Sequence, residues 1–221
     1  MQYIYNLRAA VRIFQLTSVC KLFVIFLVVA APVAAQTVIS VAPFRSIELH
    51  DGGHVILRHG AAQTVTLLKG SLDCAQFTTS DGSRLVIDKY KEQCPGKYEL
   101  EIEIVTPSIA EILVTDGGMI QSLDSFPAQA EIKTVVRNGG AIDIRTMAAD
   151  KVAASVEEGG RIFAIPRIAL LASIVNGGQI SYWGDARIES SVRRGGAVTK
   201  GAADDADKPL SELTLPCAAQ L

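Results

Sequence analysis

The sequence is poor in the residues that usually mark a chemical site. It has one tryptophan, three histidines and four cysteines among 221 residues, and its formal net charge is only −2. This mildly acidic balance argues against nucleic acid as a partner. No catalytic motif stands out, and after residue 35 no apolar run approaches the roughly 20 residues that cross a bilayer. The sequence therefore says more about shape and location than about chemistry.

The first 35 residues have the features of a secretory signal peptide. Its basic residues are Arg8, Arg12 and Lys21. An apolar run follows over Leu22–Val33, and small residues at Val33–Ala35 precede the expected cleavage point. Cleavage leaves residues 36–221 as a single domain of net charge −5, exported to the periplasm, the outer envelope or the medium. A late start codon and an uncleaved anchor remain as alternatives.

Cleavage also removes Cys20, so the mature chain keeps Cys74, Cys94 and Cys217. An odd number of cysteines in an oxidising compartment leaves one without a partner inside the chain. We predict a Cys74–Cys94 disulfide, because the turn at Ser80–Ser83 folds the intervening segment back on itself. The alternative is that Cys217 pairs with one of them.

Paired glycines recur through the second half of the chain in the same apolar frame. The pairs are Gly117–Gly118, Gly139–Gly140, Gly159–Gly160, Gly177–Gly178 and Gly195–Gly196. Their spacings of 22, 20, 18 and 18 residues indicate a stacked repeat. Since glycine supplies positive φ and close backbone approach, we interpret each pair as a corner between two strands.

Aliphatic residues occupy the same columns of every repeat. Three residues before each pair stand Val114, Val136, Val156, Ile174 and Val192, and three residues after its first glycine stand Ile120, Ile142, Ile162, Ile180 and Val198. The apolar columns alternate with mixed ones, which is the pattern of strands with one buried face. A period near 20 residues is too short for a strand plus a full helix, so the sequence predicts an all-β, right-handed β-helix-like solenoid.

The first third of the chain carries a sixth glycine pair, Gly52–Gly53, within an alternating segment that looks like a hairpin. Further strands are expected at 64–68, 74–79, 84–90 and 98–105. We expect antiparallel hairpin strands here to cap the stack, because the terminal coil of a solenoid exposes an edge. At the other end, Leu210–Leu215 is expected to form a final strand.

The order of these motifs resembles a bacterial family, the putative auto-transporter adhesin, head GIN domain. The resemblance rests on Phe44–Leu49 with Gly52–Gly53, on Leu85–Ile87, and on Glu101–Ile109 leading into Val114–Gly118. It extends over about residues 40 to 216. It implies a secreted or envelope protein with a β-helix-like fold, and it supplies no catalytic residues.

Enzymes on β-helices need carboxylates that converge on one outer face. The candidates are Asp116, Asp143, Glu157, Glu158 and Asp185. Asp143 has no acidic neighbour in its own column, and Glu157 follows Arg137 by one coil, which favours a ladder salt bridge instead. We therefore expect no catalytic residues.

Other ligand chemistries are also weakly supported. His50, His54 and His59 are close in sequence, but His54 and His59 differ in strand parity, so we expect no metal site. The residues after each glycine pair lack the further glycine and aspartate of calcium-binding β-helix repeats, so we expect no cofactor. Tyr182 and Trp183 form a candidate binding patch if their rings are exposed, and core packing or an anchor at the edge of a coil is the alternative.

The sequence thus predicts an exported, non-catalytic adhesion or envelope interaction module. Its partner would be an envelope protein or a glycan, without nucleic acid. The alternative from another class is a carbohydrate-active envelope enzyme, and a third is a structural protein without a ligand.

Overall fold

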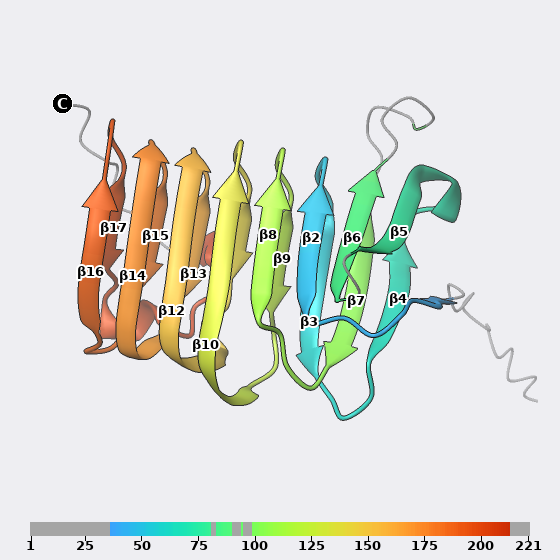
Figure 1. Cartoon of the computed structure of the whole chain (residues 1–221), viewed down its shortest axis with the longest axis horizontal. Helices are drawn as coiled ribbons and strands as arrows, with labels where there is room; N and C mark the ends of the chain where they lie inside the picture. The colour runs from blue at the N-terminus through green and yellow to red at the C-terminus, as the bar shows by residue number, and fades with distance from the viewer. Residues whose placement is uncertain (1–35, 81–82, 90–93, 95–98, 213–221) are drawn as a thin grey trace, which may run out of the picture. The chain divides into compact units, whose positions relative to one another are not determined.

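The computed structural model describes residues 36–80, 83–89, 94 and 99–212. The expected signal peptide and Cys217 lie outside these residues. In the described part the fold is all-β, as predicted, and consists of two mixed sheets that do not close on themselves (Figure 1). None of the described residues belongs to a helix of the length and apolar character that a membrane crossing requires.

The described strands are divided between the two sheets. In spatial order the nine-stranded sheet contains β1 (Thr37–Ile39), β4 (Thr64–Lys69), β7 (Glu101–Thr106), β3 (His54–His59), β9 (Met119–Ser122), β11 (Ala141–Asp143), β13 (Arg161–Ala164), β15 (Gln179–Tyr182) and β17 (Ala197–Lys200). The eight-stranded sheet contains β16 (Arg187–Val192), β14 (Pro166–Asn176), β12 (Met147–Glu158), β10 (Phe126–Arg137), β8 (Glu111–Thr115), β2 (Ser46–His50), β6 (Arg84–Lys89) and β5 (Ala75–Ser80). Short 3-10 turns are η1 (Leu72–Cys74), η3 (Ala203–Asp205) and η4 (Leu210–Glu212).

Each glycine-pair repeat contributes one strand to each sheet. Strands from successive repeats pair in parallel, and residues of the same column are partners: Ile142 pairs with Ile120 and Ile162, and Val136 pairs with Val114 and Val156. The column alignment predicted from the sequence is therefore confirmed. The alternation of inward and outward side chains follows from the period of two along each strand.

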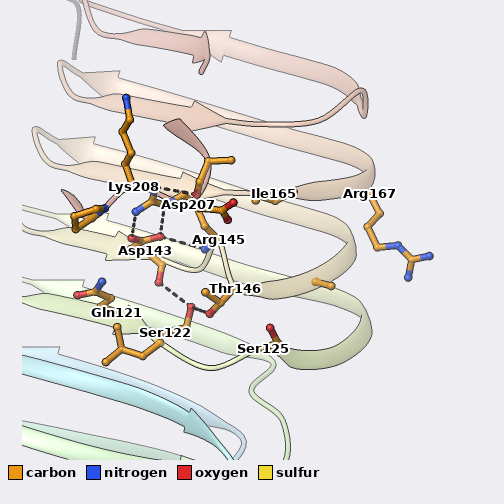
Figure 2. Close-up of a pocket in the computed structure, with 14 residues that line it drawn as sticks. Gln121, Ser122, Ser125, Asp143, Arg145, Thr146, Ile165, Arg167, Asp207 and Lys208 are labelled. Carbon is orange, nitrogen blue, oxygen red and sulfur yellow. Dashed lines mark hydrogen bonds and ion pairs between the residues drawn. The ribbon is translucent and has the colours of Figure 1, made fainter. Parts of the chain in front are cut away.

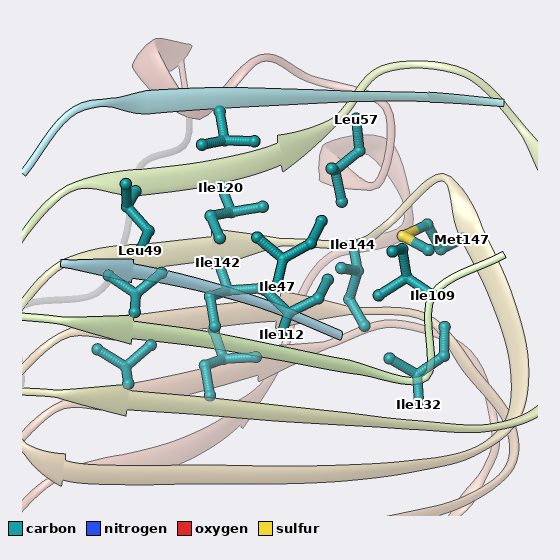
Figure 3. Close-up of a cluster of buried hydrophobic side chains, with 14 of the residues drawn as sticks. Ile47, Leu49, Leu57, Ile109, Ile112, Ile120, Ile132, Ile142, Ile144 and Met147 are labelled. Atoms are coloured by element: carbon teal, nitrogen blue, oxygen red, sulfur yellow. The ribbon is translucent and has the colours of Figure 1, made fainter. Parts of the chain in front are cut away.

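The core lies between the two sheets and is built from the aliphatic columns. Ile112, Ile132 and Ile142 are fully buried, and their side chains point into the same layer (Figure 3). Complete burial of branched aliphatic side chains stabilises the fold by about 1.5–3 kcal/mol each. The two sheets thus enclose one continuous apolar interior.

The glycine pairs lie where the chain passes from one sheet to the other. Gly139 and Gly140 have φ angles of 84° and 99°, and Asn138 before them has φ 54°. Asp116 occupies the same position of the preceding repeat with φ 59°. Asparagine and aspartate tolerate this left-handed region better than most residues, which explains their recurrence before the pair.

The expected hairpin at Gly52–Gly53 is wrong. β2 and β3, on either side of this pair, belong to different sheets, and Gly52–Gly53 is a corner like the later ones. β2 pairs in parallel with both β6 and β8, and β3 pairs in parallel with both β7 and β9. β2 and β3 therefore lie between two strand pairs that follow them in sequence, β6 with β7 and β8 with β9.

Antiparallel strands end the stack at its N-terminal side, as predicted. β1 pairs with β4 and β4 pairs with β7 in the nine-stranded sheet, while β5 and β6 form a true hairpin in the other. Beside this hairpin, a disulfide joins Cys74 to Cys94 with their Cα atoms 5.7 Å apart.

At the C-terminal side the expected strand at Leu210–Leu215 is wrong for its described part. Leu210–Glu212 forms the 3-10 turn η4, and the residues after it lie outside the described part of the chain. The chain after β17 does not add a strand to either sheet within the described residues. It turns instead onto the outer face of the nine-stranded sheet.

Candidate functional site

The candidate site lies on that outer face, in a column that alternation places toward solvent. Gln121, Asp143, Phe163, Ser181 and Thr199 are register partners across β9, β11, β13, β15 and β17. Contrary to the expectation of exposure, Asp143, Phe163 and Ser181 are each only 2% exposed. Something must therefore cover this part of the sheet.

The C-terminal segment 201–212, which we call the tail, provides the cover. Arg145 Nη1 donates hydrogen bonds to the carbonyl oxygens of Asp205 and Ala206, both at 3.1 Å. The indole Nε1 of Trp183 donates to the carbonyl oxygen of Ala202 at 2.8 Å. The side chains of Arg145 and Trp183, which follow β11 and β15, thus hold the tail through its backbone carbonyl groups.

Arg145 and Asp143 form a bidentate ion pair beneath the tail. Arg145 Nε and Nη2 donate to the two Asp143 carboxylate oxygens at 2.9 and 2.7 Å, and the two side chains are 7% and 3% exposed. The guanidinium carbon lies 5.3 Å from the centre of the Trp183 ring and 5.9 Å from that of Phe163. These contacts favour the buried charge through both the carboxylate and the aromatic faces.

Asp143 and Arg145 line a pocket of about 450 Å³ (Figure 2). Its floor is a hydrogen-bonded set in which Thr146 Oγ1 donates to Ser122 Oγ at 2.7 Å and Ser122 Oγ donates to the carbonyl oxygen of Asp143 at 3.2 Å. Arg167 and Lys208 also line the pocket, and each pairs with an aspartate, Asp150 and Asp205 respectively. Ser122, Asp143, Arg145 and Thr146 are thus engaged with one another, as expected for a structural cluster.

The other carboxylate candidates are dispersed; Asp116, Glu157 and Asp185 are paired, and Glu158 is exposed at the end of β12. Glu157 accepts from Arg137 Nε at 2.9 Å, so the predicted ladder salt bridge is confirmed. Asp116 accepts from the Asn138 amide at 2.9 Å, and Asp185 accepts from Lys200 at 2.6 Å. These pairs connect neighbouring coils and do not converge on the pocket.

The three histidines lie in separate environments. The His50 ring is 2.7 Å from Glu48 on β2, and His59 packs edge-on against Phe126 with ring centres 5.5 Å apart. His54 begins β3, and its Nε2 is buried without a hydrogen-bond partner in the described part of the chain. Among the described residues, no group of three or more potential metal-ligating side chains is close enough to hold an ion.

The interpretation of Tyr182 and Trp183 as an exposed aromatic patch does not fit the structure. Trp183 is 4% exposed, packed near Phe163 and covered by the tail, and Tyr182 packs against the core. The alternative, core packing, describes Tyr182, whereas Trp183 is buried on the outer face of the sheet beneath the tail. The signal that sequence analysis overlooked is that Arg145, Trp183 and Gly201 fall at the same position of their repeats, six residues after a pair begins.

Gly201 is expected to be required by the Trp183 ring. A Cβ at Gly201 would overlap the indole, so Gly201→Ala should displace the ring, weaken the hold on the tail and lower the free energy of unfolding by about 1–3 kcal/mol. Urea unfolding would measure this change. In a Trp183→Phe background the smaller ring should reduce the added cost of Gly201→Ala. An equal cost in both backgrounds would show that the indole is not the obstacle.

A second polar cluster crosses the outer face of the eight-stranded sheet. Glu111 on β8 accepts from Arg84 at 2.8 Å and from Lys133 at 2.7 Å. Burial acts to raise the pKa of Glu111, but the hydrogen bonds and charges of Lys133 and Arg84 outweigh it, so the pKa lies below its ordinary value. The ionised form therefore stabilises the folded state.

This cluster predicts a pH-dependent stability difference. A depressed carboxyl pKa contributes stability above the pKa of the unfolded chain and loses it as the pH falls through the folded value. Glu111→Gln should cost on the order of 1 kcal/mol near pH 7 and clearly less near about pH 3, because the contribution fades as the pH falls from the unfolded value of about 4.3 through the lower folded pKa. Urea unfolding at both pH values tests this, with exposed Glu131→Gln as the control expected to change little. A pH-independent cost of Glu111→Gln would contradict the assignment.

The chain is similar to a known protein family. Residues 43–165, more than half of the chain, match the family described as "Putative auto-transporter adhesin, head GIN domain". The chain belongs to this family. The matched region includes Asp143 and Arg145 and ends before Trp183 and the tail, so the family likeness covers only part of the candidate site. No curated protein matches the sequence.

Solved structures to which the chain is similar come from several bacteria. A putative adhesin of Bacteroides fragilis is 15% identical over 75% of this chain and 96% of its own, with a TM-score of 0.42. A putative cell adhesion protein of Clostridium sporogenes is 14% identical over 75% and 98%, with a TM-score of 0.37. A putative lipid binding protein of Parabacteroides distasonis is 16% identical over 76% and 96%, with a TM-score of 0.29.

Proposed function

We propose that the protein is an exported, non-catalytic adhesion or envelope interaction module built on a right-handed β-solenoid. Family membership over residues 43–165 carries this proposal. The parallel pairing of equal columns supports the solenoid form, with residues 36–221 as one domain. The internal pairing of Asp143 with Arg145 supports a structural role for the pocket.

The Cys74–Cys94 disulfide supports the proposed export. The Cys74–Cys94 disulfide would persist in an oxidising compartment and is unusual in the cytosol. We infer that residues 1–35 are removed on export. Mass spectrometry of protein recovered from the envelope fraction should then find Gln36 as the first residue, and recovery of the intact leader would contradict cleavage.

The proposed interaction role is tested by an assay that measures both binding to envelope material and release of products from it. The purified protein should be retained on envelope preparations or on purified envelope glycans, and it should release no oligosaccharide from them. Release of sugar products that is lost in Asp143→Asn would instead support the alternative, a carbohydrate-active envelope enzyme. Absence of both retention and release would contradict the interaction role.

A further inference from the structure

The C-terminal end of the core differs from the rest of the stack. Val192 on β16 is 45% exposed, whereas Ile174, its register partner on β14, is completely buried. Ile188 and Val198, which continue two other buried columns, are also only partly buried. The apolar interior is therefore open at this end, where a solenoid normally carries a cap.

The backbone of β16 is also open along one side. β16 is the last described strand of its sheet and pairs only with β14. Arg193 N donates to the carbonyl oxygen of Ile174 on β14 at 2.8 Å. Along a parallel strand, the backbone N–H and C=O groups of successive residues point alternately to the two sides of the strand. The N–H and C=O groups of Ile188, Ser190 and Val192 consequently point to the open edge.

The described tail leads away from this edge. It is bound by Arg145 of the β11 coil, and Pro209 lines the same pocket as Gln121 on β9, several strands from β16. All six residues of β16 are at least partly exposed. Within the described residues, nothing of the chain covers the edge.

The charges around the edge are mainly positive. Arg187 pairs with Glu189, and Lys200 pairs with Asp185. Arg193 and Arg194 are exposed, and no ion-pair partner is found for them in the described part of the chain. A second copy of this edge would bring like charges together, which disfavours self-pairing.

The size of the end also disfavours a second copy. A strand of this length spans about 20 Å, and two sheets about 10 Å apart with their side chains are roughly 20 Å deep. The end thus offers about 400 Å² to a partner, well below the roughly 800 Å² per partner of standard stable interfaces. The affinity of a peptide that binds as an added strand depends less on the buried area, because main-chain hydrogen bonds supply much of it.

We propose that the open edge of β16 binds an extended acidic segment of another protein as an added strand. Apolar residues of that segment would cover Ile188 and Val192, and the alternating carboxylates would face Arg193 on the outer surface. This inference rests on the proposed interaction role and names the kind of partner. It fits the edge because strand addition completes both the hydrogen bonds and the open core.

The test uses the purified protein and two synthetic peptides, one alternating valine with glutamate and one alternating valine with lysine. Fluorescence anisotropy should show binding of the glutamate peptide, with affinity at least about tenfold weaker for the lysine peptide and falling with salt. Hydrogen exchange followed by NMR should find the Ile188, Ser190 and Val192 amides unprotected in the free protein and protected in the complex. The Glu189 and Ser191 amides, which face β14, should be protected in both.

Substitutions test whether the peptide binds at the β16 edge or is attracted by positive charge elsewhere on the surface. Ser190→Pro removes an edge N–H without removing a bond to β14, and it should abolish peptide binding. Arg193→Glu should weaken binding of the glutamate peptide about tenfold, whereas Arg167→Glu, which changes an exposed arginine on β14, should not.

Several outcomes would overturn the inference. Protection of the edge amides in the free monomer would mean that the chain covers its own edge, and protection in a dimer seen by light scattering would mean that a second copy does. Equal binding of the two peptides, or binding of neither, would also contradict it. If Ser190→Pro is retained on envelope preparations as well as the unaltered protein is, this inference fails and the interaction role stands. Absence of retention for both proteins would contradict the interaction role itself.

Discussion

Replacing Arg145 with methionine is expected to lower the free energy of unfolding by about 3–5 kcal/mol, since it leaves the Asp143 carboxylate buried without its bidentate partner. The substitution also removes both hydrogen bonds to the tail backbone. The tail should detach, which limited proteolysis within residues 201–212 would detect. Denaturant unfolding measures the loss of stability.

A matched exposed pair provides the control. Arg137→Met breaks the ion pair with Glu157, whose side chains are 46% and 42% exposed, and should cost less than about 1 kcal/mol. The double variant Asp143→Leu/Arg145→Met removes both buried charges and should be clearly more stable than Arg145→Met alone. Equal costs at Arg145 and Arg137 would contradict the assignment of a buried, structural ion pair.

The second large effect is expected at Gly160, the second glycine of its pair. Its φ of 100° is unfavourable for a side chain, and a Cβ would lie 2.5 Å from Val136 Cγ1 and 3.0 Å from the Gly140 carbonyl oxygen of the preceding coil. Gly160→Ala should therefore cost about 3–5 kcal/mol, by backbone strain and by separation of two stacked coils.

Substitution of the neighbouring Gly159 separates the cost of the steric clash from the cost of backbone strain. Gly159 has φ 69°, and a Cβ there would meet nothing within 4 Å, so Gly159→Ala should cost only about 1–2 kcal/mol. Denaturant unfolding of the two variants compares them directly. Similar costs would show that strain alone explains the paired glycines and that close approach of the coils does not.

The repeat made the interior of the fold predictable. Equal spacing of β-branched residues such as Val136 and Ile142 implies both the strand parity and the stacking of like residues, since each column must meet itself in the next coil. The antiparallel cap followed from the need to protect an edge. The spatial order of the first strands could not be predicted, because the sequence around Gly52–Gly53 is the same whether the pair forms a hairpin turn or a corner between two sheets.

The candidate site was much less predictable. Whether Asp143 and Trp183 face solvent depends on the path of the tail, and the polar sequence of the tail gives no sign that it packs on a sheet. The available signal was the aromatic character of Phe163 and Trp183 at outward positions, together with glycine at position 201. An outward column that contains large rings must find a cover, and the nearest free chain is the tail.

We propose that the pocket around Asp143 and Arg145 is a structural cluster and that partners bind elsewhere on the surface. The most direct measurement is retention of the Asp143→Leu/Arg145→Met variant on envelope preparations, with circular dichroism to confirm its fold. We predict retention equal to that of the unaltered protein. Loss of retention in a folded variant would show that Asp143 and Arg145 form the functional site and would contradict the claim.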